Sequence, residues 1–217
     1  SEIHNLIEAF NHDRTYIRII ITRGEGEISL DPKMSTENNL IIMAKALPEN
    51  PRWWYEKGIS VVIADTLRNP SDSMDPNIKS GNYLNNVLAM NEATKQGADD
   101  AIMLNHEGFV TEATTSNIWI VKDDTILTPP TSAGILEGIT RRTLIDAITK
   151  HNLSFEEKNF TAQQLKEADE CFITSSTKLI VPVTKIDDKV LGNGLPGEIS
   201  SRLLDLYCKD VGISSVI

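Results

Sequence analysis

The chain has 217 residues, a formal net charge of −10 and an isoelectric point near 4.9, so a nucleic-acid partner is not expected, because phosphates repel an acidic surface. It shows no apolar span long enough to cross a membrane and no secretory leader, which predicts that it does not insert into membranes. Two cysteines are too few for a disulfide framework and the four histidines lack the spacing of metal ligands, so we expect a reduced, cytoplasmic protein without a metal site.

The first third of the chain is predicted to be one short helix followed by strands. We expect the helix at residues 2–10 and the strands at 15–23, 40–46 and 59–66. In the first strand, Ile17, Ile19 and Ile21 share one face, which we expect to be core. Tyr16 and Arg18 share the opposite face, which we expect to look into a cleft or to form a pair at the sheet surface.

Residues 68–76 are polar and contain two prolines, which is typical of a linker. We therefore expect two domains, a small α/β domain at residues 1–74 and a larger mixed α+β domain at residues 75–217. Further helices are expected at 83–96, 140–151 and 199–208, with a short helix after the capping box that begins at Thr161, and further strands at 101–104, 109–111, 117–121, 171–173 and 179–183. Strands and helices alternate irregularly, which favours the α+β class.

Four polar motifs supply an amine, a carboxylate and two turns suited to binding an anion. They are Lys79-Ser-Gly-Asn-Tyr83, Thr111-Glu112-Ala-Thr-Thr-Ser-Asn117, Gly138-Ile139-Thr140 and Ser176-Thr177. A lysine acts as a nucleophile only when its pKa is depressed, so a reactive Lys79 is expected to be buried, whereas most lysines are surface charges. Taken alone, Glu112 reads as an exposed turn acid. Thr140 reads as the N-cap of a helix whose first amides also suit an anion.

The order and spacing of these motifs resemble the class IV aminotransferase family. The resemblance implies a two-domain, fold-type-IV enzyme that binds pyridoxal 5′-phosphate between its domains. It implies that Lys79 bonds the cofactor and moves the substrate proton, that Glu112 holds the pyridine nitrogen protonated, and that Tyr83 hydrogen-bonds the ring hydroxyl. The phosphate contacts that it implies are Gly138, Ile139, Thr140, Ser176 and Thr177.

The resemblance extends to the front of the chain. Tyr16 and Arg18 match a pattern found near the substrate carboxylates in the branched-chain enzymes of the family. Family members normally carry several dozen further residues before this strand, among them an arginine that binds the cofactor phosphate, and we find no position for it here. We therefore expect a truncated small domain.

Several activities fit the resemblance. Tyr16-Ile-Arg18 favours a branched-chain aminotransferase, which moves an amino group from a branched-chain L-amino acid to 2-oxoglutarate, and the family implies a homodimer. A D-amino-acid aminotransferase is less favoured, because Thr22-Arg23-Gly24 is not followed by a second arginine and a histidine. A 4-amino-4-deoxychorismate lyase shares the cofactor residues. The remaining hypothesis is a cofactor-binding homologue with impaired catalysis.

Overall fold

The computed structural model describes residues 1–214 and contains two compact units, Ser1–Asn50 and Pro51–Ile217. The expected domain boundary near residue 74 falls inside the second unit. The reason is that β3 (Ile59–Ile63) pairs in parallel with both β4 (Asp100–Leu104) and β10 (Leu179–Ile186). A strand that is hydrogen-bonded along both edges belongs to the sheet it joins, so the structural division comes before the expected linker.

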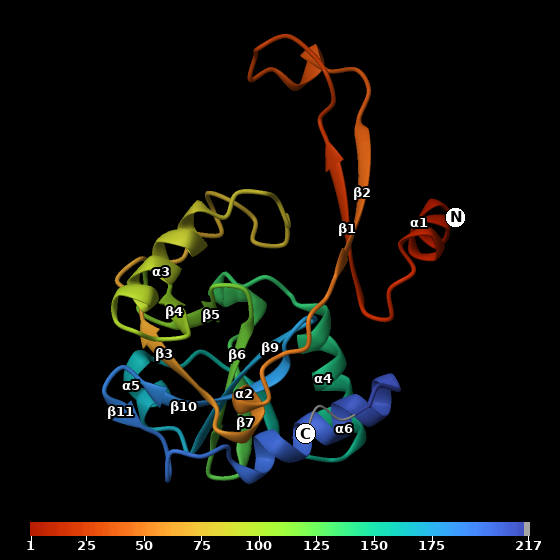
Figure 1. The fold of residues 1–217 in the computed structure, drawn as a ribbon. Helices are drawn as coiled ribbons and strands as arrows, with labels where there is room; N and C mark the ends of the chain where they lie inside the picture. Colours follow the sequence, from red (N-terminus) through yellow and green to blue (C-terminus); the bar gives the residue numbers. More distant parts are fainter. Residues whose placement is uncertain (215–217) are drawn as a thin grey trace. The chain divides into compact units, whose positions relative to one another are not determined.

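The smaller unit is a long β-hairpin preceded by one helix (Figure 1). Helix α1 (Glu2–Phe10) follows Ser1, whose hydroxyl accepts a hydrogen bond from a first-turn amide. Strands β1 (Thr15–Thr22) and β2 (Asn39–Ala46) are antiparallel and are joined through the short helix η1 (Pro32–Met34). The helix and the two strands expected in this region are therefore confirmed.

The isoleucine face of β1 is largely exposed, so the expectation that it forms core is wrong. Ile19 and Ile21 keep 54% and 72% of their surface exposed. A two-stranded sheet has no neighbouring strands to build a layered core, and within its own unit the hairpin is contacted by α1 on the side of β2. On the other face, Arg18 Nε donates to the Tyr16 hydroxyl at 3.3 Å, and the guanidinium lies 5.5 Å from the ring centroid.

The nine strands that the structure describes in the larger unit form one sheet whose pairing closes on itself. Besides β3, β4 and β10, they are β5 (Val110–Ala113), β6 (Asn117–Lys122), β7 (Thr125–Thr128), β8 (Phe155–Glu157), β9 (Glu170–Ser175) and β11 (Lys189–Val190). The order is β11-β10-β3-β4-β5-β6-β7-β8, and β9 pairs with both β10 and β6. Strands β10, β3, β4, β5, β6 and β9 thus make a ring. The mixed sheet with surrounding helices confirms the α+β class.

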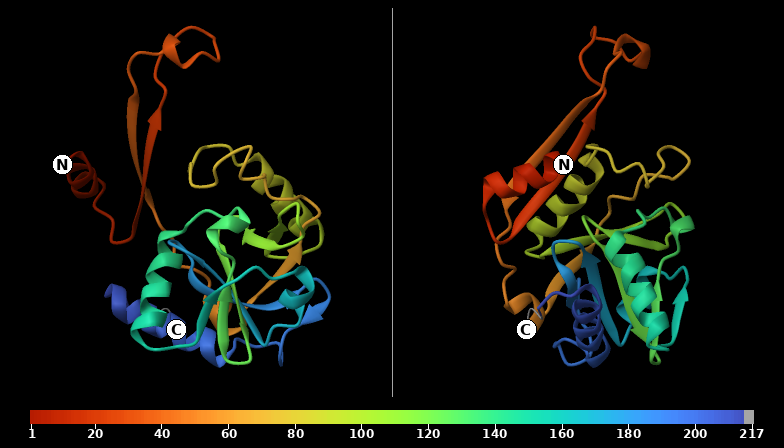
Figure 2. Two further views of the ribbon diagram at one scale, coloured as in Figure 1. Left: turned by 180° about the vertical axis from the view of Figure 1, so that it is seen from behind. Right: turned by 90° about the vertical axis from the view of Figure 1, so that its right-hand side faces the viewer.

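Helices pack on the outside of this sheet (Figures 1 and 2). Helix α3 (Leu84–Lys95) lies against β3 and β4, whereas α4 (Ile139–Lys150) and α6 (Glu198–Val211) lie side by side and contact β9. The shorter helices are α2 (Trp53–Glu56), η2 (Thr131–Ala133) and α5 (Ala162–Lys166). At the centre of the core, Trp119 stacks on Phe172 with ring centroids 5.7 Å apart, which fixes β6 against β9.

Two expected helix caps have different outcomes. Thr161 and Gln164 form the reciprocal bonds of a capping box at the start of α5, as expected. Thr140 is not an N-cap: Gly138 takes that position, and Thr140 is buried inside the first turn of α4. The helix begins at Ile139, before the hydroxyl of Thr140 could act as its cap, because isoleucine tolerates the helical backbone.

Six short elements were not expected from the sequence. They are η1, α2, β7, η2, β8 and β11, and each has four residues or fewer. Elements of this length span about one helical turn or one to two strand alternations, which is too short for a periodic pattern to stand out. Strands β7 and β11 follow tight turns after β6 and β10, whereas β8 pairs with β7 from a distant part of the sequence.

Candidate functional site

Glu112 is buried in strand β5 with 6% of its surface exposed, so it is not the exposed turn acid that its local sequence suggests. Its Oε1 forms an ion pair with Arg68 Nη2 at 2.9 Å. Its Oε2 accepts the Leu136 amide at 3.1 Å and lies 3.5 Å from Asn117 Nδ2. Burial raises the pKa of Glu112 to about 7, while the charges of Arg68 and Lys79 and the Leu136 amide act to lower it.

Arg68 is a site residue that the sequence did not reveal. We expected it to begin a domain linker, yet its amide donates to the Leu104 carbonyl at 2.8 Å and its guanidinium is mostly buried beside Glu112. Its Nε has no hydrogen-bond partner within residues 1–214. The sequence does show a cation shortly after a strand of apolar residues. That pattern indicates a buried ion pair only once Glu112 is known to be buried.

The N-terminus of α4 lies next to this carboxylate. Asn117 Nδ2 donates to the Leu136 carbonyl at 2.8 Å, and a Cβ at Gly138 would come within 2.2 Å of Asn117 Oδ1. Close approach therefore requires glycine at this position. In the described part of the chain, no side chain caps the first turn of α4, so its first amides and the positive end of its dipole are available to an anion.

Sheet pairing places the Ser176–Thr177 turn at the same end of the sheet. Asn117 pairs with Glu112 on β5 and with Thr174 on β9, so the turn begins two residues beyond this row. Trp119 Nε1 donates to Thr174 Oγ1 at 3.0 Å and holds the end of β9. Three of the sequence-predicted motifs, one on a strand, one at a helix start and one in a turn, therefore meet at one end of the sheet.

Lys79 is exposed, so the expectation that it is buried is wrong for this structure. It lies in the long segment between β3 and α3, where most side chains are exposed because few contacts cover them. Asn77 Oδ1 accepts the Glu137 amide at 3.2 Å, which ties this segment to the residue before Gly138. Tyr83 follows as the N-cap residue of α3, with its side chain exposed.

Tyr16 and Arg18 lie in the smaller unit, and their contact with each other is described above. Their assignment to substrate binding stays a prediction. Within residues 1–214, no group of three or more histidine, cysteine, aspartate or glutamate side chains is placed to hold a metal ion. Every helix in that range is also too short or too polar to span a lipid bilayer.

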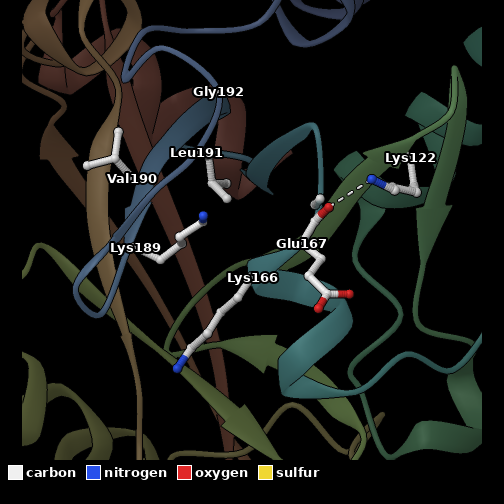
Figure 3. A pocket seen from close by; sticks show the side chains of 8 residues that line it. Lys122, Lys166, Glu167, Lys189, Val190, Leu191 and Gly192 are labelled. Carbon is white, nitrogen blue, oxygen red and sulfur yellow. Dashed lines mark hydrogen bonds between the residues drawn. The ribbon is translucent and has the colours of Figure 1, made fainter.

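A cavity of about 410 Å³ lies elsewhere on the larger unit (Figure 3). Its lining includes Lys122, Lys166 and Lys189 and none of the sequence-predicted site residues. Lys122 Nζ pairs with Asp169 at 3.1 Å, and Lys166 Nζ pairs with Asp187 at 2.7 Å. Two of its three ammonium groups are thus neutralised by carboxylates, and we do not assign the site to this cavity.

The donor set at the end of the sheet fits pyridoxal 5′-phosphate. It combines a buried carboxylate, an uncapped helix N-terminus and a hydroxyl-bearing turn, and the segment that carries Lys79 is hydrogen-bonded to the residue before Gly138. A further sign of a ligand site is Ser116 Oγ, which is buried beside Asn117 and lacks a hydrogen-bond partner among the described residues. Buried polar atoms are normally paired, so an orphan at a polar site indicates a missing partner.

Comparison with known proteins identifies the family of the chain. The family model described as Amino-transferase class IV matches residues 1–186. A putative branched-chain-amino-acid aminotransferase of Methanocaldococcus jannaschii is 39% identical over 196 residues, which cover 90% of this chain and 67% of that protein. Branched-chain-amino-acid aminotransferase-like protein 2 of Arabidopsis thaliana is 38% identical over 199 residues, which cover 91% of this chain and 35% of that protein. The chain thus spans between about a third and two thirds of these relatives.

Solved structures give the same fold. The branched-chain aminotransferase from Thermoproteus uzoniensis, determined with norvaline, has a TM-score of 0.88 at 31% identity, with 97% of this chain and 69% of that chain covered. Other members also match. A D-alanine aminotransferase of Bacillus licheniformis is 37% identical over 155 residues, 71% of this chain and 53% of that protein. A putative 4-amino-4-deoxychorismate lyase structure from Legionella pneumophila has a TM-score of 0.85 at 27% identity, with 96% and 75% covered.

Proposed function

The chain belongs to the family of class IV amino-transferases, and from this premise we propose that it forms the cofactor-binding part of a pyridoxal phosphate-dependent aminotransferase. The proposed reaction moves an amino group from a branched-chain L-amino acid to 2-oxoglutarate. The observation that carries the proposal is the buried carboxylate of Glu112 beside the uncapped N-terminus of α4. The relatives named as branched-chain aminotransferases support this choice of substrate.

Five groups of the chain would hold the cofactor: Glu112, Tyr83, the N-terminus of α4, the Ser176–Thr177 turn and Lys79. When bound, pyridoxal 5′-phosphate supplies an aldehyde that condenses with amines and a ring that accepts electrons from the substrate carbon. Glu112 would accept the N–H of the ring nitrogen, and that positive partner would favour its ionised form. Tyr83 would donate to the oxygen on the ring.

The phosphate would lie at the α4 N-terminus and the turn between β9 and β10. The amides of Ile139 and Thr140 would donate to its oxygens, and Gly138 allows the helix to start close to Asn117. Ser176 and Thr177 would add hydroxyl donors. A phosphate at a helix start gains from both the free amides and the helix dipole.

Lys79 would bond the cofactor and then hold and move the proton at the substrate Cα. Its segment is tied to the start of α4 by the hydrogen bond from the Glu137 amide to Asn77 Oδ1, which supports a position near the site. Tyr16 and Arg18 are the proposed contacts of the substrate carboxylates. A guanidinium suits a carboxylate because it offers parallel donors.

The test is a visible absorption spectrum of the purified chain with pyridoxal 5′-phosphate, before and after addition of L-leucine. After unbound cofactor is removed by desalting, wild type should keep a cofactor band that L-leucine bleaches, and Lys79→Ala should lack this leucine-sensitive band. Lys95→Ala is the matched control, because Lys95 is an exposed lysine at the far end of α3 and its removal should leave the spectrum unchanged. Absence of any band with the wild-type chain would refute the proposal for this chain.

The same experiment separates the related activities. A band that responds to D-alanine and not to L-leucine would support the D-amino-acid reaction of the relative from Bacillus licheniformis. A band that responds to neither would direct the test to aminodeoxychorismate, which the lyase-like structure suggests.

We also propose that the chain forms a homodimer, as the family resemblance implies. Sedimentation velocity at several concentrations would test this. A monomer at all concentrations that still gave the leucine-sensitive band would contradict it.

A further inference from the structure

A second buried acid, Asp100, lies behind the candidate site and was given no role by the sequence. It is the first residue of β4, and 1% of its surface is exposed. Its Oδ2 pairs with Lys178 Nζ at 3.1 Å. Its Oδ1 accepts from the Thr114 hydroxyl at 2.6 Å, the Thr114 amide at 3.2 Å and the Ala101 amide at 2.9 Å. Both oxygens are therefore satisfied, as a buried carboxylate requires.

Lys178 directly follows the Ser176–Thr177 turn and is held at three points. Its amide donates to Ser175 Oγ at 3.3 Å. Its carbonyl accepts the hydroxyl of Tyr55, a buried residue of α2, at 2.9 Å. Its ammonium reaches Asp100, as described above. The residue that ends the turn is thus fixed through both its backbone and its side chain.

Thr114 extends the connection from Asp100 to two other segments of the site. It lies two residues after Glu112, and its carbonyl accepts Asn86 Nδ2 at 2.6 Å. Asn86 is in the first turn of α3, three residues after Tyr83. Hydrogen bonds therefore run without a break from the turn through Asp100 to the end of β5 and on to the start of α3.

We infer that Asp100 and Lys178 are positioning residues, which fix the Ser176–Thr177 turn relative to the end of β5 that carries Glu112. The inference rests on the proposed function, in which the turn holds the cofactor phosphate and Glu112 holds the ring nitrogen. The turn and Glu112 would contact opposite ends of one rigid cofactor, so the distance between them must match the distance between its phosphate and its ring nitrogen. An ion pair between the two segments sets that separation, whereas a solely structural pair would stabilise the fold without affecting the phosphate contact.

The test compares the affinities of the full chain for pyridoxal 5′-phosphate and for pyridoxal, which lacks the phosphate. Each dissociation constant is measured by absorbance titration, and the ratio of the two isolates the phosphate contact. Lys178→Met should weaken binding of pyridoxal 5′-phosphate by about tenfold, the effect of losing roughly one charge-assisted contact. It should change the affinity for pyridoxal by less than about twofold. Asp100→Asn should likewise weaken the binding of pyridoxal 5′-phosphate relative to that of pyridoxal.

Two further variants show whether the effect is specific. Lys178→Arg keeps the positive charge, so it should retain most of the wild-type preference for pyridoxal 5′-phosphate over pyridoxal that Lys178→Met loses. Lys122→Met removes a different ion pair, that with Asp169, which is about half exposed, and should leave both affinities unchanged. Melting temperatures are measured alongside, and Lys178→Arg with Asp100→Asn carry the test if Lys178→Met does not fold.

Each outcome decides between the two proposals. A wild-type chain that binds neither compound overturns the proposed function, and the positioning role with it. A wild-type chain that binds both, with variants that melt earlier but keep the wild-type ratio, overturns the positioning role alone. Equal losses of both affinities would also overturn it, because the change would then not be specific to the phosphate.

Discussion

Replacing Glu112 with glutamine is expected to remove a pH-dependent loss of stability from the protein. Burial raises the pKa of Glu112 from 4.5 to about 7 in the folded state, more than Arg68 and the Leu136 amide lower it. The folded protein therefore binds this proton more tightly than the unfolded chain does. The resulting contribution to the free energy of unfolding is fully present below pH 4.5 and is lost as the pH rises through 7.

The size of the effect follows from the pKa difference. The shift from 4.5 to about 7, at about 1.4 kcal/mol for each unit, gives a loss of about 3–4 kcal/mol once the pH has risen past the folded-state pKa. Glutamine does not ionise, so the Glu112→Gln variant should lack this loss. The substitution also leaves Arg68 without its carboxylate partner, but arginine stays charged throughout the range. That penalty therefore shifts the variant's stability by the same amount at every pH.

The assay is urea unfolding of the apo chain at several values between about pH 4 and pH 8, which bracket the shifted range. Tryptophan fluorescence is suitable because Trp119 is fully buried in the core of the larger unit. The quantity of interest is the difference in unfolding free energy between wild type and Glu112→Gln. Glu107→Gln is the control, because Glu107 is an exposed carboxylate in the turn before β5. A difference that stays constant with pH, or that Glu107→Gln reproduces, would refute the reasoning.

Two further predictions concern packing. Gly138→Ala should destabilise the protein by about 1–3 kcal/mol through overpacking, because the new Cβ would lie 2.2 Å from Asn117 Oδ1. Gly81→Ala should change stability by less than about 0.5 kcal/mol, since no described atom lies within 4 Å of its added Cβ; equal effects in urea unfolding would contradict this. Burial raises the pKa of the Cys171 and Cys208 thiols, so neither should react with Ellman's reagent before the protein unfolds. Reaction of one thiol per native chain would show that one of the two cysteines is not buried.

The sequence predicted elements whose signals are local. The amphipathic pattern of residues 2–10 and the capping box at Thr161 involve neighbours within one or two helical turns, and both are confirmed. The exposure of Ile19 was predicted wrongly, because alternation shows which side chains share a face but not whether another layer covers that face. The same limit applies to Lys79, whose burial depends on what lies against a long segment rather than on its neighbours in sequence.

The candidate site was predicted in part for the same reason. The order of the motifs in the sequence predicts one site from Glu112, Gly138 and the turn at Ser176, and the structure places all three at the same end of the sheet. Arg68 and Asp100 could not be identified, because each acquires its role from a distant partner. The Asp100 and Lys178 side chains, for example, are 78 residues apart in sequence. Charged residues are mostly exposed, so the sequence alone favours a surface position for Arg68 and for Asp100.

The two buried acids are costly if the fold is considered alone. Ion pairs taken out of water are often no more stabilising than apolar groups of similar size, and the raised pKa of Glu112 shows that its charged form is disfavoured in the folded chain. Under the proposed function, their placement is explained by a cofactor that needs a fixed carboxylate and a fixed turn. Glu112→Gln should then have opposite effects in two assays: a smaller loss of stability above neutral pH, and weaker binding of pyridoxal 5′-phosphate, because the amide carries no charge to hold a protonated ring. A variant that gained in the first assay and lost nothing in the second would show that Glu112 does not contact the cofactor.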